Sequence, residues 1–122
     1  MHIGLTIKNK AEIKNFYENL LGFKLEKKFT LDKHLNQQIF GFYEDTPVFR
    51  LSNGIIDIEL FLTQLPARKN YTHISYETED RKTLVKKARK KNYPTIVVPR
   101  VDKPDLIFLQ DQFGNLFEIV KK

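Results

Sequence analysis

The stretch His2–Phe23, HIGLTIKNKAEIKNFYENLLGF, changes its hydrophobic period part-way along and decides how the fold begins. Its first six residues alternate between apolar and polar side chains, which is typical of a half-buried strand. From 10 to 21 the apolar residues follow helical spacing instead, and Gly22 comes where a helix would end. The stretch therefore predicts a strand followed by a helix over 10–21.

The same order of elements is predicted twice along the chain. After the first helix, alternating patterns predict three strands, at 23–31, 48–51 and 55–62. The segment 32–46 is ambiguous, and within it Gln38–Tyr43 suits either a strand or a loop. The second round predicts a strand at 72–78, a helix at about 80–92, and strands at 95–98, 105–110 and 116–120. Repetition of this kind indicates an internal repeat.

This pattern predicts an α+β fold of two βαβββ modules. Module one spans about 1–62, a linker containing Pro66 spans 63–70, and module two spans about 71–122. At 122 residues and 14.5 kDa the chain has the size of a single domain. We therefore expect the two modules to form one domain, 1–122.

The composition excludes several kinds of site. The chain has no cysteine, which excludes a disulfide framework, a Cys-based zinc site, an iron–sulfur cluster and a cysteine nucleophile. Any metal ion must be bound by His, Asp or Glu side chains. The apolar runs are too short to span a bilayer and the N-terminus does not resemble a signal peptide. We therefore expect a cytoplasmic protein without a membrane partner.

The net charge of +6 comes mostly from lysine, and its densest run is Arg81–Lys91. Within this run Leu84, Val85 and Ala88 recur at helical spacing, so we interpret it as an amphipathic helix with a solvated basic face. No nucleic-acid-binding motif accompanies it, and we expect no nucleic-acid partner. A basic protein can still favour anionic small substrates.

Two histidines and two glutamates occupy matching places in the two modules. A histidine begins the first strand of each module and a glutamate lies in its last strand; these residues are His2, Glu59, His73 and Glu118. Alternation places all four opposite the aliphatic face of their strand, away from the helices. Imidazole and carboxylate together suit Zn, Ni, Fe, Mn or Co. Each residue alone also suits a solvated sheet face.

Two other residues compete with this set. Asp57 lies on the same face of its strand as Glu59, so it is a rival ligand or an exposed neighbour of the site. His34 lies in the ambiguous segment, where we expect a surface or loop residue.

Both ends of the chain carry motifs of a known family. The N-terminal end combines His2, Phe16-Tyr17 and Leu21-Gly22-Phe23, and the C-terminal end reads LQDQFGNLFEIVKK. With these motifs the chain resembles the vicinal oxygen chelate (VOC) superfamily of glyoxalase I, bleomycin-resistance proteins and extradiol dioxygenases. The closing hairpin motif is matched at Asp111, Gly114, Asn115 and Glu118, whereas Gln112 stands where the family more often has proline.

The resemblance implies a fold and a metal site. Each βαβββ module would be a curved mixed sheet with a helix on its outer face. A divalent metal would be bound in the cleft between modules by His2, Glu59, His73 and Glu118. Zn or Ni are the first choices, with Fe, Mn or Co as alternatives.

The complete His/Glu/His/Glu set resembles glyoxalase I more than the other branches. It implies a metal-dependent lyase or isomerase of glyoxalase I type (lactoylglutathione lyase-like) acting on a small vicinal-oxygen substrate such as a hemithioacetal. Glu118 or Glu59 would be the catalytic base as well as a ligand, and glutathione or another thiol would be a co-substrate. Two alternatives stay open: a non-catalytic drug-sequestering protein of the bleomycin-resistance type, or a metal-dependent dioxygenase.

The resemblance also implies a homodimer. In small relatives a second subunit commonly completes the cleft, with ligands contributed from both chains. The linker at 63–70 is long enough for module two either to fold back on module one or to reach a neighbouring chain. The sequence leaves both arrangements open.

Overall fold

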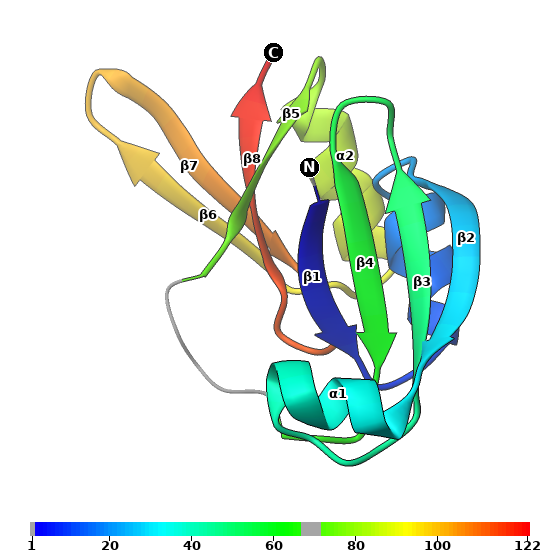
Figure 1. Cartoon of the computed structure of the whole chain (residues 1–122). Helices are drawn as coiled ribbons and strands as arrows, with labels where there is room; N and C mark the ends of the chain where they lie inside the picture. The colour runs from blue at the N-terminus through cyan, green and yellow to red at the C-terminus, as the bar shows by residue number, and fades with distance from the viewer. Residues whose placement is uncertain (1, 67–71) are drawn as a thin grey trace. The chain divides into compact units, whose positions relative to one another are not determined.

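Two four-stranded sheets with the same strand order account for the strands of this computed structural model, which describes residues 2–66 and 72–122. Contacts within the chain divide it into two units, Met1–Pro66 and Ala67–Lys122. Each unit carries one sheet with its helices, so the fold is α+β with two βαβββ-like modules, as predicted (Figure 1).

The sheet of the first unit has the order β1-β4-β3-β2. Its strands are β1 (His2–Ile7), β2 (Lys24–Leu31), β3 (Thr46–Ser52) and β4 (Asp57–Leu62). β1 pairs in parallel with β4, while β3 pairs antiparallel with both β4 and β2, so the sheet is mixed. This order places the first and last strands of the unit side by side.

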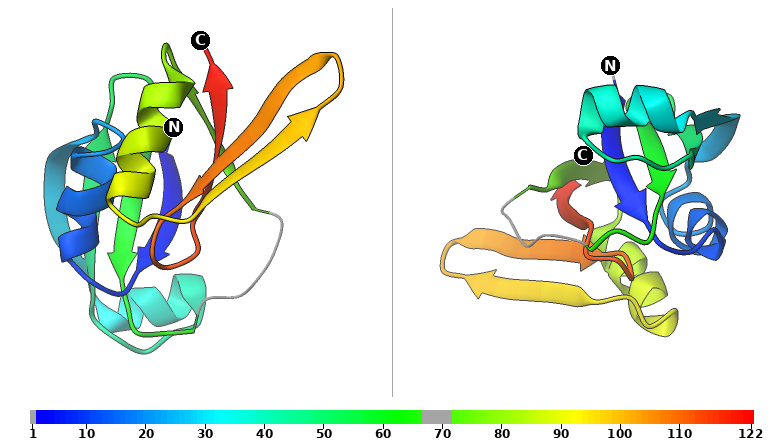
Figure 2. Two further views of the ribbon diagram at one scale, coloured as in Figure 1. Left: turned by 180° about the vertical axis from the view of Figure 1, so that it is seen from behind. Right: turned by 60° about the horizontal axis from the view of Figure 1, so that its bottom comes forward.

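The helix in this segment is shorter than the predicted range 10–21, and it is wider than an α-helix. It is η1 (Ile13–Glu18), a π-helix in which the amides of Asn19 and Leu21 donate to the carbonyls five residues earlier. Phe16 and Tyr17 are fully buried on its inner side. Figure 2 shows this helix covering one face of the first sheet. Gly22 ends the segment with φ +74°, a backbone conformation that favours glycine.

A second helix, α1 (Lys33–Phe40), lies in the segment that the sequence left ambiguous between strand and loop. Asp32 caps its N-terminus by accepting from the amides of His34 and Leu35, at 2.9 and 3.3 Å, and Gly41 ends it with φ +81°. Three of its apolar side chains are about half exposed: Leu35, Ile39 and Phe40. Helices are predicted from sequence by a stripe of apolar residues that will be buried, and α1 lacks such a stripe.

The second unit repeats the first arrangement with the order β5-β8-β7-β6. Its strands are β5 (Ile74–Thr78), β6 (Thr95–Arg100), β7 (Lys103–Gln110) and β8 (Leu116–Lys121). β5 and β8 pair in parallel, and the other two pairings are antiparallel.

The helix α2 (Arg81–Lys90) contacts β6 and β8. It buries Leu84, Val85 and Ala88, which confirms that the basic run forms an amphipathic helix. Asp80 caps it: the Thr83 hydroxyl and amide donate to its carboxylate and hold the pKa of Asp80 below its usual value.

Side-chain hydrogen bonds hold the turns that precede β4 and β8, the strands that carry Glu59 and Glu118. Before β4, the Asn53 side chain accepts from the amides of Ile55 and Ile56. Before β8, the Asp111 carboxylate is almost fully buried and accepts from the amides of Phe113 and Asn115 and from the Asn115 side chain. These bonds satisfy the buried carboxylate and set the start of β8.

The two glutamate strands alternate as predicted. Ile58 and Leu60 are fully buried on one side of β4, and Phe117 and Ile119 are buried on one side of β8. The residues between them are only partly exposed and face the opposite side. Each sheet therefore has one packed face and one open face, and each glutamate lies on the open face.

No helix among the described residues is long and apolar enough to cross a membrane. The predicted linker at 63–70 lies only partly within the described residues, because 67–71 fall outside them.

Candidate functional site

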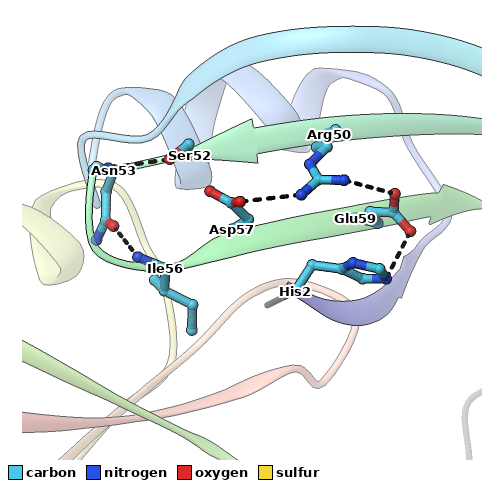
Figure 3. A network of polar contacts seen from close by, with 8 residues as sticks. His2, Arg50, Ser52, Asn53, Ile56, Asp57 and Glu59 are labelled. Atoms are coloured by element: carbon cyan, nitrogen blue, oxygen red, sulfur yellow. Dashed lines mark hydrogen bonds and ion pairs between the residues drawn. The ribbon is translucent and has the colours of Figure 1, made fainter.

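The first His–Glu pair is formed on the open face of the first sheet. Gly4 on β1 pairs with Glu59 on β4. His2 lies two residues before Gly4 and therefore on the same face of the sheet, where it is a neighbour of Glu59. The Nε2 atom of His2 is 3.2 Å from Oε1 of Glu59 (Figure 3). The Glu59 side chain is only 13% exposed, whereas that of His2 is about half exposed. One side of the pair is therefore open to a ligand.

Arg50 on β3 connects this pair to Asp57. Its Nη2 atom donates to Oδ2 of Asp57 at 3.1 Å, and its Nη1 atom lies 3.8 Å from Oε2 of Glu59. Hydrogen bonds from the Ser52 side chain and from Arg50 hold the pKa of Asp57 below its usual value. Figure 3 shows that Arg50 lies on one side of Glu59 and His2 on the other. Arg50 thus orients Glu59 with Oε1 toward His2.

The second pair repeats the register of the first. Ser75 on β5 pairs with Glu118 on β8, and His73 stands two residues before Ser75, just as His2 stands two residues before Gly4. The Nε2 atom of His73 is 3.5 Å from Oε1 of Glu118. The two units therefore present the same pair of side chains from equivalent positions.

The donor atoms of each pair lie about as far apart as two ligands of one metal ion would. Two ligand atoms at about 2.1 Å from one ion, at angles of about 90–110°, lie about 3.0–3.4 Å apart. The observed 3.2 Å of the first pair lies within this range and the 3.5 Å of the second lies just outside it, and both are also distances of a direct ion pair between His and Glu. Imidazole nitrogen and carboxylate oxygen are also the ligand types that zinc and its neighbours take in proteins. The residues present therefore fit a divalent transition-metal ion.

Each unit supplies two donors rather than a complete centre. Among the described residues, no group of three or more His, Asp or Glu side chains is placed to hold a metal ion. The structure brings His2 to Glu59 and His73 to Glu118, while Asp57 pairs with Arg50. His34 is exposed on α1, with its ring 5.5 Å from that of Tyr43.

A cavity of about 490 Å³ extends from the first pair along the open face of the first unit. Four polar residues that the sequence interpretation did not identify line it: Asn36, Glu44, Thr46 and Thr63. Aromatic side chains line it as well, among them Phe40, Phe42 and Phe61. Asn36 and Phe40 lie on the unpredicted helix α1, and Phe42 and Glu44 lie in the segment that follows it. The capping residues Asp32 and Gly41 were the sequence signals that could have located this helix.

The fold and the paired His–Glu positions together define the glyoxalase-like class of two-module proteins. The chain belongs to the Glyoxalase/Bleomycin resistance protein/Dioxygenase superfamily, whose family model matches residues 1–119. This confirms the resemblance drawn from the terminal motifs. No curated protein is similar enough in sequence to count as a match.

Solved structures share the fold at low sequence identity. A glyoxalase family protein from Bacillus cereus has a TM-score of 0.75 and 15% identity, covering 98% of this chain and 91% of its own. The trypanothione-dependent glyoxalase I of Leishmania major has a TM-score of 0.70 and 20% identity, with 98% and 84% covered.

A point mutant of a fosfomycin resistance protein, FosX from Listeria monocytogenes, was solved with Mn(II) and 1S,2S-dihydroxypropylphosphonic acid. It has a TM-score of 0.69 and 16% identity, covering 97% of this chain and 85% of its own. Relatives with one fold therefore include proteins of different named activities, and the fold does not decide between them.

Proposed function

We propose that the protein is a metal-dependent lyase or isomerase of glyoxalase I type that acts on a small vicinal-oxygen substrate such as a hemithioacetal. In this proposal His2, Glu59, His73 and Glu118 bind one divalent ion, Zn or Ni first among the candidates, and the two modules work as one domain. The observation that carries it is the repeated His–Glu pair at equivalent strand positions.

The residues of this site divide the chemistry between them. When bound, the ion would polarise two adjacent substrate oxygens and so make a neighbouring C–H more acidic. Glu59 or Glu118 would take that proton and return it at the adjacent carbon, since each carboxylate lies on an open face beside a histidine. Arg50 would keep Glu59 in position through its contact with Oε2.

A screen of metal-loaded protein tests the proposed activity. The protein is stripped of metal, reloaded separately with Zn(II), Ni(II), Co(II), Mn(II) and Fe(II), and assayed with hemithioacetals of glutathione and other thiols and with other 2-oxo compounds. We expect that the protein isomerises one of these substrates only when it is loaded with metal. Tight small-molecule binding without metal would support the drug-sequestering alternative, and oxygen consumption with Fe(II) or Mn(II) would support a dioxygenase.

We further propose that the protein is a homodimer in which His2 and Glu59 of one chain meet His73 and Glu118 of its partner. One His–Glu pair per unit allows this arrangement, because each unit forms its own pair and needs two further ligands from another unit. Closed twofold symmetry would then create two equivalent sites.

Mixing two inactive variants tests the shared site. Glu59→Gln and Glu118→Gln chains are unfolded together and refolded at equal concentration. If sites are shared, half of the dimers are mixed and each contains one intact site, so about a quarter of wild-type metal binding and activity should return. Each variant refolded alone serves as the control. No recovery in a mixture shown to contain mixed dimers would place all four ligands in one chain.

Asp57→Asn should weaken metal binding about tenfold, within the range for residues that support metal ligands. The substitution removes the charge that balances Arg50, leaving the guanidinium to pair with Glu59. Isothermal titration with Zn(II) or Ni(II) measures the change. Glu26→Gln, an equal charge change at an exposed position on β2, is the control. Equal affinities in wild type and Asp57→Asn would show that the charge of Asp57 does not influence Glu59 through Arg50.

A further inference from the structure

The cavity of the first unit has a second polar end, away from His2 and Glu59. Glu59 and Phe61 on β4 and Thr63, just past the end of β4, follow one another on the same open face. At about 3.3 Å per residue, Glu59 and Thr63 lie roughly 13 Å apart. Figure 1 shows α1 across the end of the sheet toward which β1 and β4 run, which is the Thr63 end. The cavity thus joins two separate polar groups of residues.

At this second end the Glu44 carboxylate is held in a fixed position by neutral donors. Thr63 donates to its Oε1 atom at 2.7 Å, and Thr46 donates to the same atom at 3.2 Å. Asn36 in turn donates to the Thr46 hydroxyl and to the Glu44 carbonyl, each at 2.9 Å. Both threonines and Asn36 are buried. The carboxylate is therefore preorganised by groups that carry no charge.

The charges around the cavity favour a cation at Glu44. The titratable side chains among the described residues that line the cavity are His2, Glu44 and Glu59. Two of the three are carboxylates, although the chain as a whole has a net charge of +6. Glu59 has His2 and Arg50 as partners. The ion pairs found among the described residues include none to Glu44. A buried or half-buried carboxylate gains most from an oppositely charged partner that also donates hydrogen bonds.

The wall between the two ends is aromatic. Phe40 and Phe61 pack edge to face with ring centroids 5.6 Å apart, and both line the cavity. Gly4 leaves room beside the Phe61 ring: a Cβ at this position would approach that ring to 3.2 Å. An apolar segment of a ligand could lie against these rings, and a cation near them would gain from the ring faces.

We propose that Glu44 is a specificity-determining residue that binds a protonated amine of a small amphipathic ligand, whose apolar part packs against Phe40 and Phe61. The opposite end of that ligand would place its oxygens at His2 and Glu59. Only this last feature rests on the proposed function, because Glu44 and the aromatic wall do not require a metal.

Binding of three matched probes to metal-free protein tests the proposal. Phenylpropylamine, phenylpropanol and phenylpropionate share one apolar body and end in a cation, a neutral hydroxyl and an anion. With EDTA present at neutral pH, isothermal titration should show the amine binding at least about tenfold tighter than the alcohol, and the acid weakest. An affinity order that does not favour the amine would overturn the proposal.

Two variants assign the preference to Glu44. Glu44→Gln keeps the size of the side chain and an oxygen for the threonine hydroxyls but removes the charge, and should leave amine and alcohol within about twofold of each other. Glu26→Gln should retain the wild-type preference. Thr63→Val should reduce the preference by a smaller factor, because it loosens the carboxylate without removing it. Amide NMR spectra confirm that each variant is folded.

A preference for the amine that survives Glu44→Gln in a folded protein would place the cation elsewhere and contradict the assignment. Because metal is absent throughout, failure of the proposed metal chemistry would leave this result unchanged. Conversely, metal-dependent turnover without any amine preference would support the proposed function and reject the role of Glu44.

Discussion

Glu118→Gln should lower the affinity for divalent metal by more than about 100-fold and abolish metal-dependent turnover. Residues that only support metal ligands already cost 10–100-fold when removed, so loss of a ligand is expected to cost more. The amide is a poorer ligand than the carboxylate and cannot act as a base. Since Glu118 is partly exposed and, among the residues that the structure describes, its ion pair is with His73, the fold should persist.

The control for this prediction is Glu79→Gln, an equal change of charge at an exposed position in the same unit. Metal affinity is measured by isothermal titration and turnover with the substrate found in the screen. Unchanged metal affinity and unchanged turnover in Glu118→Gln would remove Glu118 from the site and favour the drug-sequestering alternative.

Leu60→Ala should destabilise the protein by about 2–5 kcal/mol, the range for truncating a buried leucine. Leu60 is fully buried and pairs with Leu5 on β1 and Phe49 on β3, so its loss leaves a cavity beneath the sheet. Glu59→Gln, one residue away on the open face, should change the free energy of unfolding far less. Urea unfolding of both variants measures the difference.

This comparison tests the assignment of faces on which the site depends. Neighbouring residues on a strand point to opposite sides, so Leu60 and Glu59 should affect different properties. Leu60→Ala should lower stability and leave metal affinity nearly unchanged in the folded protein, whereas Glu59→Gln should do the reverse. Similar losses of stability in both variants would mean that Glu59 lies in the packed core.

Much of the fold follows from local patterns in the sequence. Alternation of apolar and polar residues predicts the strands and their two faces at His2–Ile7 and around Glu59 and Glu118. It does so because one face of each sheet is packed and the other is open. The basic helix α2 could be predicted because Leu84, Val85 and Ala88 form its buried side. The terminal motifs, which include glycine and asparagine in the turns, were sufficient to identify the family, and the family model confirms it.

The remaining features depend on contacts that a local pattern does not contain. Helix α1 leaves Leu35, Ile39 and Phe40 half exposed, so its sequence has no clear buried stripe. Helical spacing over 10–21 predicts a helix but does not distinguish the five-residue hydrogen bonds of η1 from those of an α-helix.

The partners of the site residues are equally non-local. The contact between Arg50 and Glu59 requires β3 to pair with β4 in one register. Glu44 meets Thr63 only because the segment after α1 returns to the end of β4. The sequence interpretation identified His2 and Glu59 from their matching positions in the repeat, but it had no signal for Glu44.

The metal content of the wild-type protein tests the central claim most directly. The protein is loaded with Zn(II) or Ni(II), passed through a desalting column and analysed for metal and protein concentration. Because two His–Glu pairs are proposed to bind one ion, we predict one tightly bound ion per chain, whether the site is shared between chains or not. Two ions per chain would mean that each pair binds metal separately, and no retained metal would contradict the metal centre altogether.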